Sequence, residues 1–204
     1  RIKYLLSSKV FSDFISSPGS LQASDLIRIC PIVFSNNWKQ LRKLHIEVLS
    51  PGISFTNYSV TNISRIIKNL KDLNELCIRF YDCFNFTHKG GRSILLGTKY
   101  LRNLNQFRHS FELCPGIIEN DLIELQQSLN RNKKITTLDF HNRKCGVLSN
   151  KIFVPLKNMF LSLQQLKCFK FYFERFELLT NEGLNTFAET FSSLSHLEEM
   201  QFGI

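Results

Sequence analysis

Ser110, Asp139 and His141 carry the groups from which a hydrolytic site could be built. In such a site a histidine takes the serine proton, a carboxylate orients the histidine, and backbone donors stabilise the oxyanion. The strand pattern described below commits the nearby backbone donors to a sheet, and no GxSxG turn exposes a serine. We therefore predict that the protein is not an enzyme, and we assign no catalytic residue.

The cysteines could in principle bind metal or form disulfides, but their spacing argues against both. The six of them are scattered along the chain, at positions 30, 77, 83, 114, 145 and 168, without a CxxC pair. The five histidines are equally dispersed, so we predict no metal site and no cofactor. Reduced thiols then indicate an intracellular, reducing compartment, either cytoplasmic or nuclear.

A repeated apolar pattern organises most of the chain. The pattern, as in Leu73-x-x-Leu76-x-Ile78, begins at residues 41, 73, 104, 135, 166 and 197, at intervals of 32, 31, 31, 31 and 31. Alternate apolar residues predict a strand at each of these positions. Apolar residues at helical spacing follow, such as Leu184, Phe187 and Phe191 in the fifth repeat. Each unit is thus predicted to be a strand, a loop, a helix and a second loop.

The aromatic stretch LKCFKFYFERF at 166–176 could be a stacking platform for nucleic-acid bases or one strand of a core. Its Phe169, Phe171 and Phe173 occupy the slots that are apolar in the other repeats. Because side chains alternate across a strand, Tyr172 is the only aromatic residue at 169–173 that faces the opposite side. We interpret the phenylalanines as core residues.

The L-x-x-L-x-L pattern resembles that of the leucine-rich-repeat family, in particular its ribonuclease-inhibitor-like branch with long repeats. The resemblance implies a right-handed α/β solenoid with a repeat of about 31 residues, a concave parallel sheet and convex helices. It covers residues 41–204, while residues 1–40 are predicted to be a degenerate N-terminal repeat or cap. Phenylalanine replaces many of the family's leucines, and we expect the segment to be part of a longer solenoid.

Function in this family usually resides on the concave face, whose residues follow from the strand alignment. One predicted row is His45, Cys77, Arg108, Asp139, Lys170 and Gln201; the next is Glu47, Arg79, Ser110, His141, Tyr172 and Gly203. This polar surface of mixed sign indicates a non-enzymatic scaffold or adaptor subunit of a larger assembly. The predicted protein-binding residues are Arg79, Arg108, Asp139, His141, Lys170 and Tyr172.

The charge distribution supports an alternative. The formal net charge is +9, and five glutamates but no Lys or Arg follow Arg175, so residues 1–175 carry +14. Basic edge loops could bind RNA, within a ribonucleoprotein, or an acidic protein surface. The candidate contacts in these loops are Lys89, Arg92, Arg131, Lys133, Lys134, Arg143 and Lys144. No apolar run is long enough to cross a membrane, and we expect no membrane insertion.

His109 interrupts the third repeat. It occupies a core slot that is filled by isoleucine or phenylalanine elsewhere, as at Ile78 and Phe140. A buried neutral imidazole needs a hydrogen-bond partner, or a bulge must turn the ring outward. We therefore expect one of these two arrangements at His109, and this is where the predicted register is most open to failure.

Overall fold

The computed structural model describes residues 2–5, 41–49, 55–85, 87–114, 119–130, 132–144, 148–174, 176–178, 180–191 and 194–203. The predictions for Arg131, for Cys145 and for most of residues 1–40 lie outside this part of the chain.

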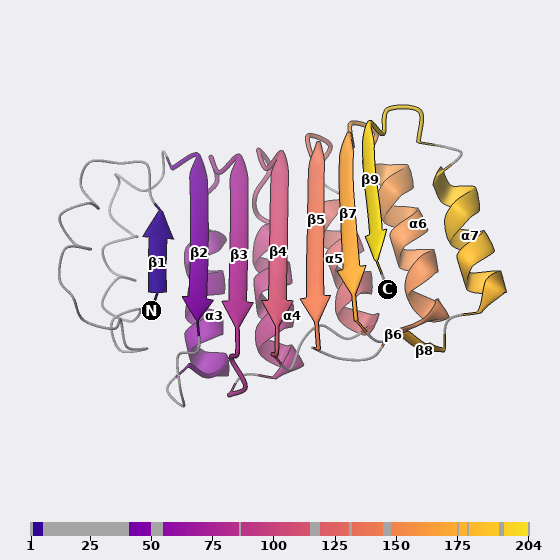
Figure 1. Ribbon diagram of the computed structural model, residues 1–204. Coiled ribbons are helices and arrows are strands. Elements are labelled where there is room, and N and C mark those ends of the chain that lie inside the picture. Colours follow the sequence, from indigo (N-terminus) through magenta and orange to yellow (C-terminus); the bar gives the residue numbers. More distant parts are fainter. Residues whose placement is uncertain are drawn as a thin grey trace.

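A seven-stranded sheet forms one layer of the molecule (Figure 1). Its order is β1 (Ile2–Leu5), β2 (Lys43–Leu49), β3 (Glu75–Tyr81), β4 (Gln106–Glu112), β5 (Thr137–Arg143), β7 (Cys168–Phe173) and β9 (Glu199–Gly203). Strands β2 to β9 are mutually parallel, as the sequence predicts, whereas β1 pairs antiparallel with β2. A small second sheet joins β6 (Leu148–Ser149) to β8 (Phe176–Leu178).

Helices cover one face of the large sheet, behind the strands in Figure 1. They are α3 (Asn57–Ile67), α4 (His88–Thr98), α5 (Glu119–Leu129), α6 (Phe153–Ser162) and α7 (Asn181–Phe191). A 3-10 turn, η3 (Asn150–Ile152), comes directly before α6. Polar residues mark where helices begin: Thr87 accepts the Lys89 N–H at 3.3 Å, and Ser149 accepts the Lys151 N–H at 3.3 Å.

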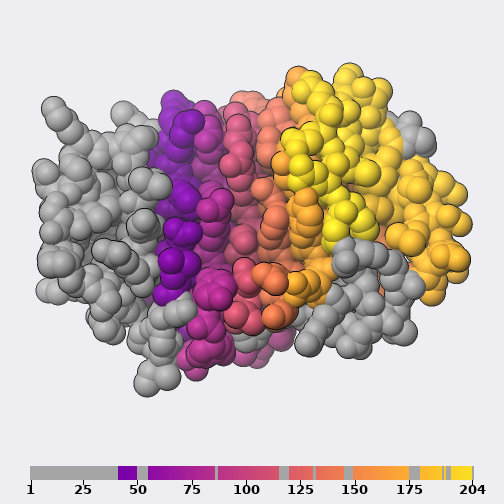
Figure 2. All heavy atoms as spheres, in the orientation of Figure 1, coloured from indigo at the N-terminus to yellow at the C-terminus, as the bar shows by residue number. Residues whose placement is uncertain are grey.

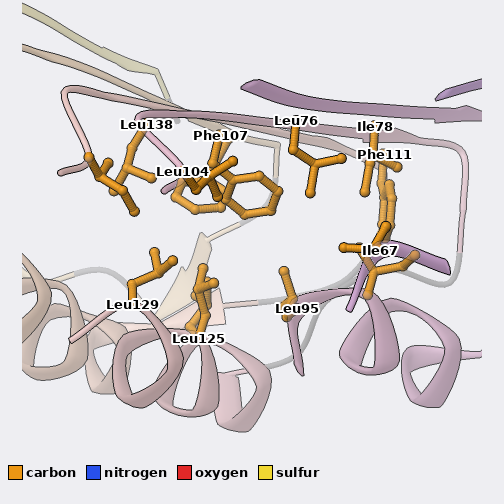
Figure 3. Packing of buried hydrophobic residues seen from close by; sticks show 14 of the residues in the cluster. Ile67, Leu76, Ile78, Leu95, Leu104, Phe107, Phe111, Leu125, Leu129 and Leu138 are labelled. Carbon is orange, nitrogen blue, oxygen red and sulfur yellow. The ribbon is translucent and has the colours of Figure 1, made fainter. Parts of the chain in front are cut away.

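The core lies between the sheet and the helices. Figure 3 shows Leu76, Phe107 and Leu138 of the strands facing Leu95 and Leu125 of the helices. All five are almost completely inaccessible to solvent. Phe169, Phe171 and Phe173 of the aromatic stretch belong to this core, since all three are buried. The prediction that they are core residues rather than a stacking platform is confirmed.

The strand ends turn in a recurring left-handed conformation. Asp82, Leu113 and Lys144 follow β3, β4 and β5, and have φ values of 57°, 52° and 55°. The Asp82 and Leu113 N–H groups donate to the carbonyls of Glu112 and Arg143, each at 2.9 Å. These bonds extend the pairing of neighbouring strands beyond the strand ends, which offsets the cost of a positive φ at non-glycine residues.

One sequence-based expectation about the basic residues is wrong. Lys89 and Arg92 lie in the first turns of α4 rather than in a loop, because Thr87 caps the helix before the HKGGR stretch. Leu184, one of the apolar residues at helical spacing, lies in α7 and is 36% exposed. No described helix packs on the outer side of α7, so that part of its apolar face stays open. Met200 of β9 is 46% exposed at the same end of the sheet.

The predicted partner or bulge at His109 is also absent. His109 aligns with Ile78 and Phe140 without a register shift, and only 1% of its surface is exposed. Neither ring nitrogen reaches a hydrogen-bond partner on another residue of the described chain. Its ring lies instead among aromatic side chains, with centroids 3.9 Å from Phe111 and 6.0 Å from Phe140. The aromatic packing therefore keeps the register despite the polar residue.

Burial lowers the pKa of His109 from 6.5 to about 3, and the opposing effects of its own backbone and of Asp139 are smaller. Between these values the unfolded chain binds a proton that the folded protein excludes. Stability is therefore fully retained above pH 6.5 and falls as the pH drops, by up to about 1.4 kcal/mol per pH unit.

We predict that His109→Leu stabilises the protein, because it removes two buried polar nitrogens without partners. The advantage over the wild type should grow by about 2 kcal/mol between pH 7 and pH 5 in urea unfolding. His196→Leu, at an exposed turn, is the control and should not reproduce this growth. A pH-independent difference between His109→Leu and the wild type would show that the imidazole is not excluded from protonation.

Candidate protein-binding site

The sheet face away from the helices, which we call the open face, presents polar side chains in rows. Figure 2 shows this face, with β3, β4 and β5 lying between β2 and β9. The predicted neighbours are found in register: Cys77, Arg108, Asp139 and Lys170 on one row, and Arg79, Ser110, His141 and Tyr172 on the next. All six predicted protein-binding residues thus share one surface.

A cavity of about 310 Å³ opens at the centre of this face. It is lined by residues of β3, β4 and β5, namely Cys77, Ile78, Arg79, Arg108, His109, Ser110, Asp139 and His141. Four of the six predicted binding residues line it, while Lys170 and Tyr172 lie on the neighbouring strand β7. The sequence predicted the rows of the face, but gave no sign of a hollow within them.

Two arginines at the cavity have little internal compensation. Arg79 is 52% exposed, and its Nη1 lies 4.0 Å from Glu47 Oε1, the limit of an ion pair. Arg108 is exposed and forms no ion pair with any described residue, although it stands opposite Asp139 in the register. The positive charge also acts on His45: burial lowers the pKa of His45 most, and the charge of Arg79 lowers it further.

Asp139, His141, Tyr172 and Gln201 form a chain of contacts beside these arginines. His141 Nε2 lies 3.2 Å from Asp139 Oδ1, and its ring centroid is 4.3 Å from that of Tyr172. The Tyr172 hydroxyl donates to Gln201 Oε1. A Cβ at Gly203 would come within 2.5 Å of Tyr172 Cδ1, so glycine makes room for this ring position. The contacts hold Tyr172 against the cavity edge.

The hydrolytic trio is not assembled. His141 Nε2 contacts Asp139, and Ser110 makes no hydrogen bond to His141 in the described structure. A serine nucleophile needs that hydrogen bond to lose its proton. The cavity geometry therefore supplies no argument for catalysis.

Lys170 is less available than its position suggested. Its Nζ lies 2.7 Å from Glu199 Oε1, and this hydrogen bond raises its pKa. Lys43 is similarly engaged, with Nζ 2.6 Å from Glu75 Oε1. On the open face, Arg79 and Arg108 therefore differ from the lysines, which have close carboxylate partners.

The basic edge residues are largely occupied within the protein. Arg92 forms a bidentate contact with Glu124 across α4 and α5, and Arg143 contacts both Glu112 (3.1 Å) and Glu174 (2.6 Å). In the loop, Lys133 Nζ donates a hydrogen bond to the Ser162 carbonyl, and Lys134 Nζ donates one to Asn103 Oδ1. Lys89 and Lys144 have no side-chain partner among the described residues, and Arg131 lies outside them.

The thiols are free where the structure describes them. Cys83 and Cys114 are buried behind the strand ends, where Cys114 Sγ lies 3.1 Å from Glu112 O. Cys77 and Cys168 are half-buried, and burial raises the pKa of both thiols, that of Cys168 to about 11 with help from Glu199. Within the described ranges, no cluster of three or more His, Cys, Asp or Glu could hold a metal ion.

Sequence patterns missed polar contacts that join the starts of neighbouring helices. Asn57 and Thr87 bond each other across neighbouring units, with Thr87 N–H donating to Asn57 Oδ1 at 2.9 Å. Asn150 and Thr180 repeat the arrangement at 3.1 Å. The residues of each pair are 30 positions apart, and this equal spacing was the one signal in the sequence that could have predicted the contacts. None of the helices among the described residues has the length and apolar character that a membrane crossing requires.

Comparison with known proteins identifies the type of fold but no family. No model of a protein family matches the sequence, and no curated protein does. Among solved structures, the tropomodulin C-terminal domain of Caenorhabditis elegans is similar over 84% of this chain and 92% of its own, with a TM-score of 0.55 and 11% identity. The domain called leiomodin-1 actin-binding site 2 is similar over 86% of this chain and 90% of its own, with a TM-score of 0.51 and 14% identity. The chain thus has an α/β fold of leucine-rich-repeat type.

We predict that Gly203→Ala displaces the Tyr172 ring, because the added methyl group would overlap Cδ1. The His141 ring protons should then shift in NMR spectra as the neighbouring ring current is lost, while the free energy of unfolding changes by less than about 1 kcal/mol. Tyr172→Phe serves as a matched control, since it keeps the ring and loses only the bond to Gln201. Unchanged His141 resonances in Gly203→Ala would contradict the described packing.

Proposed function

We propose that this protein is a non-enzymatic binding module that recognises another protein through the open face of its sheet. The proposal rests on the central cavity, at which Arg79 is weakly paired and Arg108 forms no ion pair with any residue that the structure describes. Exposed arginine beside an anchored tyrosine is a combination enriched at protein interfaces. The contact residues are Arg79, Arg108, Asp139, His141, Lys170 and Tyr172, with Lys170 able to contribute by exchanging its Glu199 partner.

The architecture we propose for this function is a curved, right-handed solenoid of repeats of about 31 residues across residues 41–204, continuing in a longer chain. Residues 1–40 act as its cap or as a degenerate repeat. The in-register strand pairing and the left-handed turns at Asp82, Leu113 and Lys144 support such regularity. We assign it to the ribonuclease-inhibitor-like branch on the helix that follows each strand.

We further propose that the module serves as a scaffold or adaptor subunit in an intracellular, reducing compartment. Free thiols at Cys77, Cys83, Cys114 and Cys168 support this setting. Actin is a partner worth testing, since one solved structure of similar fold is named as an actin-binding site.

The alternative is an RNA-associated subunit that uses the basic edge residues. It is favoured by the charge of +14 over residues 1–175. Against it, Arg92, Lys133, Lys134 and Arg143 already bond to groups of the same chain. Binding phosphates would require these bonds to be exchanged, which reduces the gain in free energy.

The two functions can be separated with paired variants of the tagged full chain, purified from native extract with and without nuclease. We predict a stoichiometric protein partner that survives nuclease, identified by mass spectrometry. His141→Ala/Tyr172→Ala should reduce its recovery at least tenfold, since the pair forms the aromatic edge of the cavity. Lys133→Gln/Lys134→Gln should retain it, and sedimentation with actin filaments tests that partner directly.

The opposite pattern would overturn the proposal. If nuclease releases all partners and only Lys133→Gln/Lys134→Gln reduces recovery, the protein is nucleic-acid-associated. Thermal unfolding of both variants must match that of the wild type, because a loss of stability would also reduce recovery.

A further inference from the structure

We infer that the open-face cavity takes an extended acidic segment of the partner, with carboxylates at Arg79 and Arg108 and an apolar side chain against Tyr81 and Phe84. This inference rests on the proposed function and specifies the chemistry of the partner. It follows from which charges on the face are satisfied and which are not.

The first step is the charge inventory of the face. Lys43 pairs with Glu75 and Lys170 with Glu199, so these charges are locally balanced. Asp139 is the one carboxylate among the residues that line the cavity; it lies 3.2 Å from His141, and its buried Oδ1 accepts no hydrogen bond in the described chain. The two arginines remain, one with a carboxylate at 4.0 Å and one with none in the described chain. The surplus charge at the cavity is therefore positive.

The second step is geometry. Arg108 faces Cys77 and Asp139 in the register, while Arg79 faces Glu47 and Ser110. The two guanidinium groups therefore arise from adjacent strands and adjacent rows, and both line the same cavity. A guanidinium binds a carboxylate through two parallel N–H donors, so this pair suits two carboxylates of one segment.

The third step is an apolar anchor on the same strand as Arg79. Tyr81 lies two residues further along β3, on the same face, and is 40% exposed. Phe84 follows the strand end and is 59% exposed. Two residues of an extended chain span about 7 Å, so one strand-like segment can reach both the arginines and Tyr81. Large exposed aromatic side chains beside arginine are typical anchors of an interface.

The same inventory argues against a nucleic acid in this cavity. Polynucleotide binding draws on many phosphate contacts, whereas only two cations here lack close partners. Glu47 stands opposite Arg79 and Asp139 stands opposite Arg108 in the register, and both carboxylates would repel a continuous run of phosphates. Separate carboxylates placed between these groups are compatible with them.

The probe for this inference is a short fluorescein-labelled peptide with two glutamates and a leucine at alternate positions, compared with its glutamine counterpart. We expect fluorescence anisotropy of the full chain to show binding of the glutamate peptide, weakened at least tenfold by glutamine. Arg79→Gln/Arg108→Gln should cause a similar loss, and Tyr81→Ala/Phe84→Ala a loss of about fivefold.

The control is Arg92→Gln/Lys167→Gln, which removes the same charge from exposed pairs with Glu124 and Glu198. It should change the affinity less than about twofold. Equal losses in the two double variants would show attraction to net charge and overturn the inference, as would equal binding of both peptides or preferential binding of single-stranded RNA.

The proposed function is tested separately by the His141→Ala/Tyr172→Ala variant and the cellular partner. If that variant loses the partner but the glutamate peptide does not bind, the open face is a binding surface, and the inference that its ligand is acidic is wrong. If neither effect is seen, both proposals fail.

Discussion

The in-register parallel pairing of the strands is the constraint on which the rest of the structure depends. Each strand from β2 to β7 donates and accepts along its full length, so equivalent side chains stack in rows on both faces. A shift of one residue would exchange Phe107 with Arg108 and Phe140 with His141. The hydrophobic cost of that exchange fixes the inner rows, and the inner rows fix the polar rows of the open face.

The rows tolerate polar substitutions because neighbouring rings maintain the packing. His109 and Asn142 occupy buried slots without side-chain partners in the described chain, yet Phe140 and Phe111 keep their places around His109. Phe80 and Phe111 stack at 5.0 Å, and Phe171 and Phe202 at 5.7 Å. These aromatic contacts, where a leucine-rich repeat would have leucines, thus stabilise the alignment.

Much of this order could be predicted from the sequence, since apolar periodicity records which side of a strand is buried. The rows containing Arg108 and Tyr172 follow directly from it. What periodicity cannot encode is the choice of side-chain partner: Asp139 contacts His141 rather than its cross-strand neighbour Arg108. The start of α4 at the HKGGR stretch also escaped prediction, because adjacent glycines suggest a loop, whereas Gly90 and Gly91 are buried in the helix.

We propose that Arg79 and Arg108, which lack close carboxylate partners among the described residues, are where a partner docks on the open face. The most direct measurement is NMR of the arginine Nε–H resonances as the purified partner is added. We expect the Arg79 and Arg108 signals to shift and become protected, while those of Arg92 and Arg143, which are paired with carboxylates of the same chain, stay in place. Shifts confined to Arg92 and Arg143 would contradict this proposal and move the binding surface to the basic edges.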